Sequence, residues 1–339
     1  MPKNYKEAVI ITDLHLRDDI HPKYLDAQLA TLKRIVTSKK YDCVLILGDI
    51  FEHRTSKSIV LIKFYEFLKS IKTGRIIILR GNHDTVSKTN TTETILSMYD
   101  NVAEIVDDVS DISIFKTPCT FIPHFEDDQI LAKAVSKTKN LVFGHFGIHG
   151  MVTNGGYVYE SVLKPSDFNN RGILGHIHAH KIYENKVHIV GNQYTVNFGE
   201  ANQEKYYYEL KFYNNGEVDI FPKKVKFGIK HLNVNMENIH KIYKKFNIKD
   251  FFTLLRVNID ELDMFKEREI RNELNKKYHY DLLDLRFDNI LDKNSSKFYT
   301  NKKLFSINEG ILEDYIQQNE STFSKNELRK TLTEIYDFK

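Results

Sequence analysis

Short runs of apolar, mostly β-branched residues recur through the first two thirds of the chain, and each ends abruptly in polar residues. The runs are AVIITDLH (8–15), DCVLILGD (42–49), RIIILRGNHD (75–84), LVFGH (141–145) and RGILGHIH (171–178). Uninterrupted apolar runs of this length are typical of strands buried on both faces. Amphipathic patterns near 23–38 and 57–72 predict helices between the early runs, and this alternation favours a layered α/β fold.

Polar side chains follow each predicted strand at the point where the apolar run stops. Ligands in such folds bind beyond the carboxyl ends of the strands, so we expect these side chains to meet at one edge. They are Asp13, His15, Asp49, Asn82, His83, Asp84, His145, His176 and His178. Each alone has a structural explanation, since Asp13 and Asp84 could cap helices and Asn82 could form a turn. Together, so many imidazoles and carboxylates at one edge would be costly without a cation.

Carboxylates, imidazoles and one amide oxygen make a mixed oxygen and nitrogen ligand set. Such a set suits manganese, iron, zinc or magnesium, and it lacks the thiolates typical of closed structural zinc sites. The candidates outnumber the ligands that one ion accepts. Two divalent ions about 3.5–4 Å apart, bridged by one carboxylate, are the arrangement that such a set favours.

Five short motifs, taken in order, resemble the signature of the calcineurin-like metallophosphoesterases. They are D-x-H at 13–15, G-D at 48–49, G-N-H-D at 81–84, G-H at 144–145 and G-H-x-H at 175–178. The resemblance implies an α/β fold in which a layered β-sandwich is flanked by helices. It also implies a metal-dependent hydrolase of phosphoesters.

The same resemblance implies a role for each motif residue. The ligands implied for one divalent ion are Asp13, His15, Asp49 and His178. The ligands implied for a second ion are Asp49, Asn82, His145 and His176. Asp49 would therefore bridge the two ions. His83 is implied as the general acid or as an imidazole that contacts the phosphate, with Asp84 orienting it. His180 has no counterpart in the last motif and is expected to be a bystander.

Three further features resemble the SbcD-type DNA nucleases, a group that includes the recombination nuclease subunit of T-even phages. These features are GDIFEHR at 48–54, the segment 190–200 that ends in Phe-Gly-Glu, and the layout of the C-terminal third. The match has two departures, because Asn192-Gln193-Tyr194 replaces a small-residue-Pro core and Glu52 stands where archaeal and eukaryotic relatives have histidine.

This resemblance implies a manganese-dependent DNA exo- and endonuclease subunit, with magnesium as the alternative metal. Its implied partner is a coiled-coil ATPase of the SbcC type. The chain has no G-x-x-x-x-G-K-[ST] motif of its own, so any ATP dependence must come from that partner. Relatives often form homodimers, so a homodimer is a further expectation. One rival is a stand-alone metallophosphatase or nucleotide phosphohydrolase. Another is a catalytically inactive scaffold that binds DNA ends.

The chain is expected to divide into three parts. Residues 1–222 form the nuclease domain, which closes with a hairpin around Asn214-Asn215-Gly216. Residues 223–290 form a small α/β capping domain that contacts DNA, and residues 291–339 form a linker and a helical tail. Two S-x-x-E capping boxes, at 306–309 and 324–327, mark short helices in the tail.

Helices this short are marginal alone in water, so their apolar faces are expected to pack on each other, on the rest of the chain or on a partner. The resemblance to SbcD-type nucleases implies that they dock on the ATPase. The face of the first helix holds Ile311, Leu312, Tyr315 and Ile316. The face of the second holds Leu328, Leu332, Ile335 and Tyr336.

The formal net charge is only +3, so contacts to DNA must come from a local patch. The candidates are Lys223, Lys224, Lys226 and Lys230, although a lysine cluster is more often a solvated face.

Cys43 and Cys119 lie in apolar runs and are expected to be reduced, buried thiols. No apolar run is long enough for a signal peptide or a membrane span, so we expect a cytoplasmic protein, in the host cytoplasm if phage-encoded.

Overall fold

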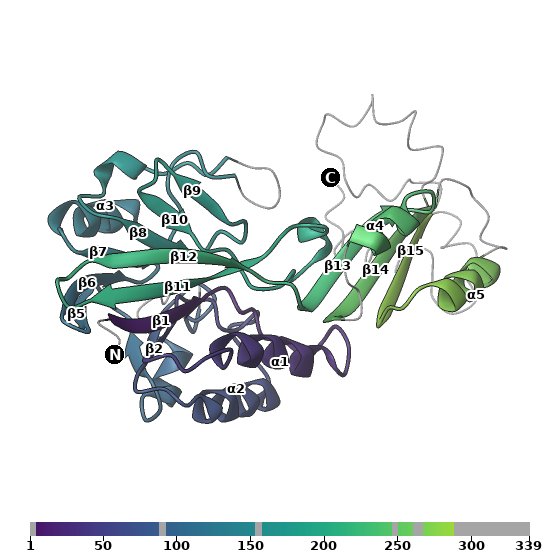
Figure 1. Ribbon diagram of the computed structural model, residues 1–339, viewed down its shortest axis with the longest axis horizontal. Helices are drawn as coiled ribbons and strands as arrows, with labels where there is room; N and C mark the ends of the chain where they lie inside the picture. Colours follow the sequence, from purple (N-terminus) through teal and green to yellow (C-terminus); the bar gives the residue numbers. More distant parts are fainter. Residues whose placement is uncertain (1–4, 88–92, 153–157, 246–249, 260–266, 288–339) are drawn as a thin grey trace, which may run out of the picture. The chain divides into compact units, whose positions relative to one another are not determined.

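The buried apolar runs become the central strands of two six-stranded sheets (Figure 1). The computed structural model describes residues 5–87, 93–152, 158–245, 250–259 and 267–287. The first sheet has the order β12-β11-β1-β2-β3-β4, with strands β1 (Tyr5–Ile11), β2 (Cys43–Ile46), β3 (Ile76–Leu79), β4 (Glu104–Val106), β11 (Tyr206–Tyr213) and β12 (Val218–Lys224). Strands β1 to β4 are parallel, while β11 and β12 form the predicted hairpin, of which β11 pairs antiparallel to β1.

The second sheet has the order β5-β6-β7-β8-β10-β9. Its strands are β5 (Ser110–Ile114), β6 (Thr117–Ile122), β7 (Leu141–His145), β8 (Gly172–Gly175), β9 (Lys181–Tyr183) and β10 (Val187–Ile189). The inner strands β6, β7, β8 and β10 are parallel to one another. The apolar runs at 141–145 and 171–178 therefore lie side by side, as β7 and β8.

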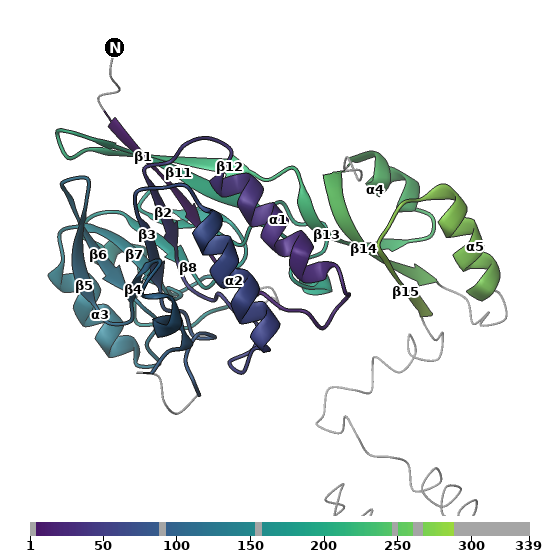
Figure 2. The same cartoon turned by 90° about the horizontal axis from the view of Figure 1, so that it is seen from below.

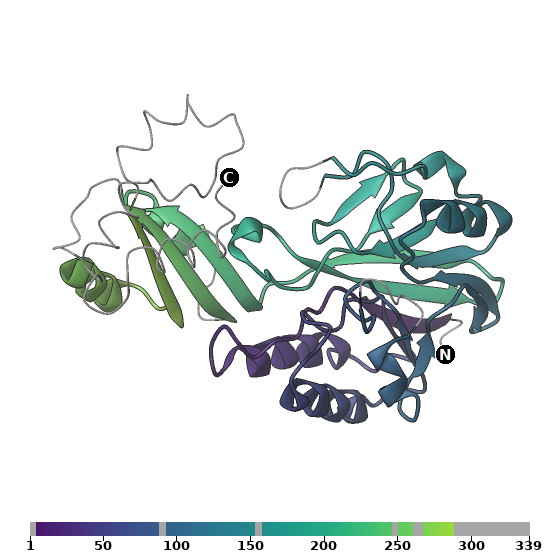
Figure 3. The same ribbon diagram turned by 180° about the vertical axis from the view of Figure 1, so that it is seen from behind.

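Helices cover the outer faces of both sheets, as Figures 2 and 3 show from two further directions. Helices α1 (Tyr24–Val36) and α2 (Ser58–Ser70) share one hydrophobic cluster with one face of β1, β2 and β3. Helix α3 (Asp128–Lys137) packs on the second sheet. A separate cluster fills the space between the sheets and buries both free cysteines. The predicted α/β sandwich flanked by helices is confirmed.

Among the described residues, three short 3-10 helices lie in the connections, namely η1 (Ile95–Tyr99), η2 (Pro165–Asp167) and η3 (Phe198–Glu200). The last of these follows the G-H-x-H motif and carries a residue of the site described below.

A third, parallel sheet follows β12. It contains β13 (Gly228–Asn235), β14 (Phe251–Ile259) and β15 (Leu282–Phe287), with helices α4 (Ile239–Lys245) and α5 (Glu267–Lys277). One face of the sheet packs on α4 and α5. Ile229 and Leu254, by contrast, join the cluster that holds α1.

The predicted domain boundary at residue 222 falls inside β12, and the described residues cluster into one compact unit. The three-part division of the chain therefore stays a prediction. The tail and its two apolar faces lie outside the described residues.

Within the part of the chain that the structure covers, no helix has the length and apolar character needed to cross a bilayer.

Packing between the two sheets should carry much of the stability. Phe143 of β7 is fully buried, and its ring stacks on Phe121 with centroids 4.9 Å apart. Phe143→Ala should lower the free energy of unfolding by about 3–5 kcal/mol, because it removes buried area and leaves a cavity. Urea denaturation measures this. Ile182→Ala, at a 38% exposed position of β9, is the control and should change it by less than about 0.5 kcal/mol. A loss below about 1 kcal/mol for Phe143→Ala would contradict the assigned packing.

Candidate metal centre

The loops that leave β1 and β2 run side by side beyond the ends of the strands. The amides of Asp13 and His15 donate to the carbonyls of Gly48 and Asp49, both at 3.0 Å. These hydrogen bonds extend the parallel pairing into the loops, although neither loop is regular strand. The first two motifs are therefore held against each other by main-chain hydrogen bonds.

Four of the predicted ligands have a positive φ, which is uncommon for residues other than glycine. The values are 52° for Asp13, 44° for His15, 50° for Asp49 and 80° for His176. Such conformations cost free energy and persist only where the surroundings impose them. Their concentration at one edge of the sandwich marks that edge as a functional site.

Two motif glycines are required by close approach of other atoms. A Cβ on Gly81 would lie 2.3 Å from the carboxylate Oδ1 of Asp49, and one on Gly175 would lie 2.2 Å from the hydroxyl of Thr12. No side chain fits at either distance. These glycines therefore let the loops approach closely enough for the ligands to converge.

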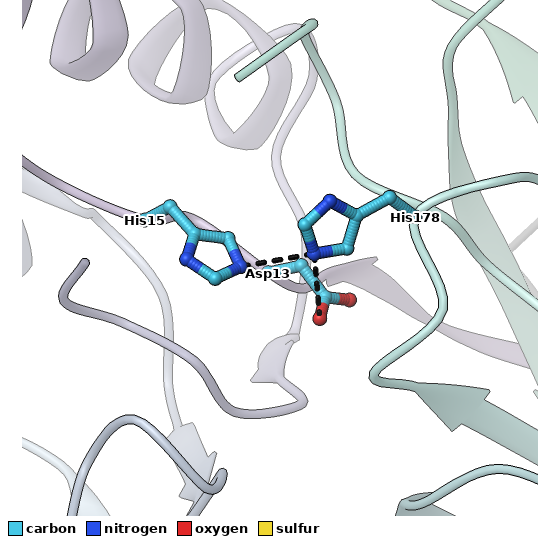
Figure 4. A group of neighbouring side chains, drawn as sticks. All are labelled: Asp13, His15 and His178. Atoms are coloured by element: carbon cyan, nitrogen blue, oxygen red, sulfur yellow. Dashed lines mark hydrogen bonds and ion pairs between the residues drawn. The ribbon is translucent and has the colours of Figure 1, made fainter. Parts of the chain in front are cut away.

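Asp13, His15 and His178 form the first group of ligand atoms (Figure 4). The Nε2 atoms of His15 and His178 lie 3.0 Å apart, and Nε2 of His178 lies 3.8 Å from Oδ1 of Asp13. Oδ2 of Asp49 lies 3.7 Å from Nε2 of His15. The four residues that the sequence predicts for one ion therefore meet.

Asn82, His145 and His176 converge on the other side of Asp49. Oδ1 of Asn82 lies 3.0 Å from Nδ1 of His176 and 3.2 Å from Nε2 of His145. Nε2 of His145 lies 3.3 Å from Oδ1 of Asp49. One carboxylate oxygen of Asp49 thus faces each group, which is the arrangement expected of a bridging ligand.

Hydrogen bonds behind the rings fix which nitrogen His178 and His145 present. Nδ1 of His178 donates to Oε1 of Glu200 at 2.5 Å, and Nδ1 of His145 donates to the carbonyl of Leu47 at 2.6 Å. With these protons engaged, the Nε2 lone pairs point inward. Lone pairs aimed at one another and at carboxylate oxygens repel unless a cation lies among them. The donor set therefore fits two divalent ions.

The pKa values of two buried carboxylates, Asp49 and Glu200, are also set by their neighbours. Burial would raise the pKa of Asp49, but His145 and His15 in their protonated form hold this pKa well below its usual value, as any cation among these atoms would. Burial likewise opposes ionisation of Glu200. The hydrogen bond from His178 and the charge of Lys205 nevertheless keep the pKa of Glu200 far below its ordinary value. Both carboxylates are therefore ionised at neutral pH.

The structure corrects the role expected for Asp84. Its carboxylate accepts hydrogen bonds from the amides of Ile50 and Gly81, at 2.8 and 2.9 Å, and does not orient the His83 ring. Burial and the nearby Asp49 raise the pKa of Asp84 to about 6. Asp84 ties the loop after β2 to the loop after β3. The ring of His83 is held instead through its Nδ1, which donates to the carbonyl of Glu52 at 2.8 Å.

Lys230 is a second correction. It is only 4% exposed, and its ammonium group donates to the carbonyl of Gln203, so it faces protein and not solvent. Lys224 is exposed and pairs with Glu204 at 2.5 Å. Lys223 is half-buried and lies 3.8 Å from Glu209, whereas Lys226 is exposed. Three of the four lysines thus remain candidates for contact with an anion.

His180 lies apart from the ligand groups. Its ring stacks on Tyr206 with centroids 4.1 Å apart, and its Nε2 lies 3.1 Å from the hydroxyl of Tyr208. It is half-buried against these tyrosines rather than placed at an open turn. Among the described residues, it belongs to no group that could hold an ion.

Two site residues were missed by the sequence reasoning. Glu200, at the end of η3, is fully buried behind His178, and Lys205 lies 2.7 Å from its other oxygen. A carboxylate behind a ligand histidine is common in metal sites, and the segment 190–200 contained the signal. His124 lies after β6, buried, with its ring centroid 5.5 Å from that of His176. No motif includes His124, so only the fold reveals it.

The sandwich and its converging ligands define a metal-dependent hydrolase of phosphoesters. A family comparison agrees, because the model of the calcineurin-like phosphoesterases matches residues 8–180, just over half of the chain. The chain therefore belongs to the calcineurin-like phosphoesterase family. A search of curated proteins found no significant match.

Three solved structures are similar to this chain. Nuclease MPE of Pseudomonas putida has 18% identity and a TM-score of 0.30, over 54% of this chain and 66% of that one. Purple acid phosphatase PPD1 of yellow lupin (Lupinus luteus) has 12% identity and a TM-score of 0.44, over 66% and 52%. A novel archaeal phosphodiesterase has 13% identity and a TM-score of 0.36, over 64% and 99%. This chain thus spans about two thirds of the length of nuclease MPE and about half of the length of purple acid phosphatase PPD1. Similarity this low says nothing about its substrate.

Glu200 should matter for metal binding although it is not placed as a ligand. Glu200→Gln should weaken the binding of divalent cations by about 10–100-fold, because the carboxylate that orients His178 is lost. It should also lower the free energy of unfolding, since Lys205 keeps a buried charge without its partner. Calorimetric titration with Mn²⁺ and urea denaturation measure the two effects. Glu217→Gln, at an exposed turn, is the control. Unchanged cation affinity in Glu200→Gln would refute the assignment.

Proposed function

We propose that this chain is the manganese-dependent DNA nuclease subunit of an SbcCD-type recombination and repair complex. The observation that carries the proposal is the pair of ligand groups that share Asp49, with His83 beside them. Oxygen and nitrogen ligands suit Mn²⁺, with Mg²⁺ as the alternative. The GDIFEHR motif and the segment 190–200 support DNA as the substrate by their resemblance to SbcD-type nucleases.

The proposed ligands of one ion are Asp13, His15, Asp49 and His178, and those of the other are Asp49, Asn82, His145 and His176. When bound, two such ions supply Lewis-acid activation of the phosphodiester and of the attacking water.

The protein's own contribution to proton transfer falls to His83. Its Nδ1 donates to the Glu52 carbonyl, so the proton for the departing oxygen is the second one, which Nε2 carries in the imidazolium form; its transfer leaves His83 neutral with Nδ1 still protonated. The edge of the His83 ring meets His15 with centroids 5.0 Å apart, which keeps the imidazole next to the first ligand group. His83, His15 and Asp49 also lie close enough to hold an ion together. A role for His83 as a ligand is therefore the alternative that a substitution must test.

Contact with the DNA backbone is proposed for Lys223, Lys224 and Lys226. The first two end β12, and the third lies in the short connection to β13. Phosphate contacts of this kind position a duplex without reading its sequence. The small third sheet would then act as the capping domain that guides DNA toward the site.

Purified protein with Mn²⁺ should cleave labelled single-stranded or double-stranded DNA. His83→Ala should lose about 10²–10⁴-fold in cleavage rate, because general acid catalysis contributes about that much. Calorimetry on the same variant should still find two bound Mn²⁺ ions.

His180→Ala is the matched control, since it removes an imidazole that contacts tyrosines and not ligands, and it should cleave at the normal rate. Hydrolysis of small phosphomonoesters alone would favour the stand-alone phosphatase, and inactivity on every phosphoester would favour the end-binding scaffold. Loss of a metal ion in His83→Ala would make His83 a ligand.

The helical tail is proposed to bind the coiled-coil ATPase, by the apolar faces that the sequence predicts. Replacing Leu312 and Leu332 by Asp should abolish co-purification with a co-expressed SbcC-type ATPase, because charge cannot be buried in an apolar contact. Basal cleavage of DNA should be retained. Replacing Gln317 and Gln318 by Ala in the same tail is the control. Normal co-purification of the Asp variant would exclude this docking site.

A further inference from the structure

Glu52 lies at the meeting point of two histidines of the site. The loop after β2 pairs with the loop after β1 through a bridge between Leu16 and Phe51, both fully buried. The amide of Glu52 then donates to the carbonyl of Leu16 at 3.2 Å. These contacts place Glu52 directly beside His15 and Arg17, although 35 or more positions separate them in sequence.

The side chain of Glu52 faces the back of the His15 ring. Its Oε2 lies 3.0 Å from Nδ1 of His15, at an ion-pair distance, although the angle is outside that of a directed hydrogen bond. Its Oε1 lies 3.3 Å from Nη1 of Arg17. Arg17 is itself fixed by Asp19, through two hydrogen bonds of 2.6 and 2.8 Å. The carboxylate is thus held from one side and directed at His15 on the other.

The main chain of Glu52 contacts the second histidine. Its carbonyl accepts the hydrogen bond from Nδ1 of His83 at 2.8 Å. One residue therefore touches Nδ1 of two neighbouring rings, one through its side chain and one through its backbone. A hydrogen-bond acceptor at Nδ1, as for His83, or a carboxylate charge beside Nδ1, as for His15, favours a ring proton there and leaves Nε2 for another partner.

We propose that Glu52 is a positioning residue that sets which nitrogen His15 and His83 present to the site. Its carboxylate directs Nε2 of His15 toward the metal, and its carbonyl directs Nε2 of His83 toward the substrate. The proposal rests on the ligand assignment of the proposed function, but not on DNA as the substrate. Because the two contacts use different parts of Glu52, a change of its side chain should alter His15 and leave His83 in place.

Metal binding without DNA tests the first contact. Glu52→Ala should weaken the binding of one of two Mn²⁺ ions by about 10–100-fold in calorimetric titration, as for other residues behind a ligand. Glu52→Gln keeps an oxygen that can accept the Nδ1 proton, so it should recover part of that loss. Glu273→Ala removes an exposed glutamate of α5 and should bind Mn²⁺ normally. Equal affinities in Glu52→Ala and the unsubstituted protein would overturn the proposal.

The independence of the two contacts is tested by NMR of metal-free protein with ¹⁵N-labelled histidine, with resonances assigned from His15→Ala and His83→Ala. Glu52→Gln should shift the Nδ1 proton signal of His15 and leave that of His83 unchanged. A shift of both signals, or of neither, would overturn the proposal. Because Gln is nearly isosteric with Glu, this variant remains informative if Glu52→Ala fails to fold.

One further variant separates this inference from the ligand assignment beneath it. His178→Ala should lose one Mn²⁺ ion outright. If His178→Ala still binds two ions, the ligand assignment fails and the inference with it. If it loses one ion while Glu52→Ala binds normally, only the inference about Glu52 fails.

Discussion

The carboxylate of Asp49 lies between two sets of imidazole nitrogens, and much of the surrounding structure serves to hold it there. Its backbone has a positive φ, and Gly81 must lack a side chain to let it fit. The carboxylate of Asp84 binds the amides on both sides of this contact and joins the two loops. Repulsion among inward lone pairs would open such a cluster in the absence of a cation. The strain is therefore balanced by packing elsewhere in the fold.

Both sheets contribute to that packing. Both are also needed for the site, because neither sheet carries a complete set of ligands. Asp13, Asp49 and Asn82 follow strands of the first sheet, whereas the ligand histidines at the ends of β7 and β8 belong to the second. The distance between the first sheet's ligands and the second sheet's histidines is thus set by the apolar layer between the sheets, which includes the stacked pair of Phe121 and Phe143. A layer packed to crystal-like density changes little in thickness, so it holds the two halves of each ligand group at a fixed separation.

The parts of the fold and the site that the sequence predicts are those governed by local pattern. Continuous apolar runs identified the central strands, and abrupt polar ends identified the residues that converge. Contacts between distant segments were not predicted, because no local sequence pattern encodes them. Lys230 shows this, since β13 buries it although the lysines that precede it, Lys224 and Lys226, are exposed. Asp84 shows it too, because its partners lie in the loop after β2 as well as beside it. The three-residue strands β9 and β10 are too short to leave a periodic signal.

The segment between the last motif and β11 supplies no ligand, yet it joins the metal centre to the third sheet. Glu200 of this segment holds His178, and it also accepts a hydrogen bond from the amide of Val196 at 3.2 Å. The adjacent Thr195 exchanges hydrogen bonds with the backbone and ring of His231 in β13, at 2.7 and 2.9 Å. A chain of short, buried contacts thus runs from β13 to a ligand histidine. The third sheet and the metal centre share one structural element, so the sheet that would guide a substrate is anchored to the residues that orient the ligands.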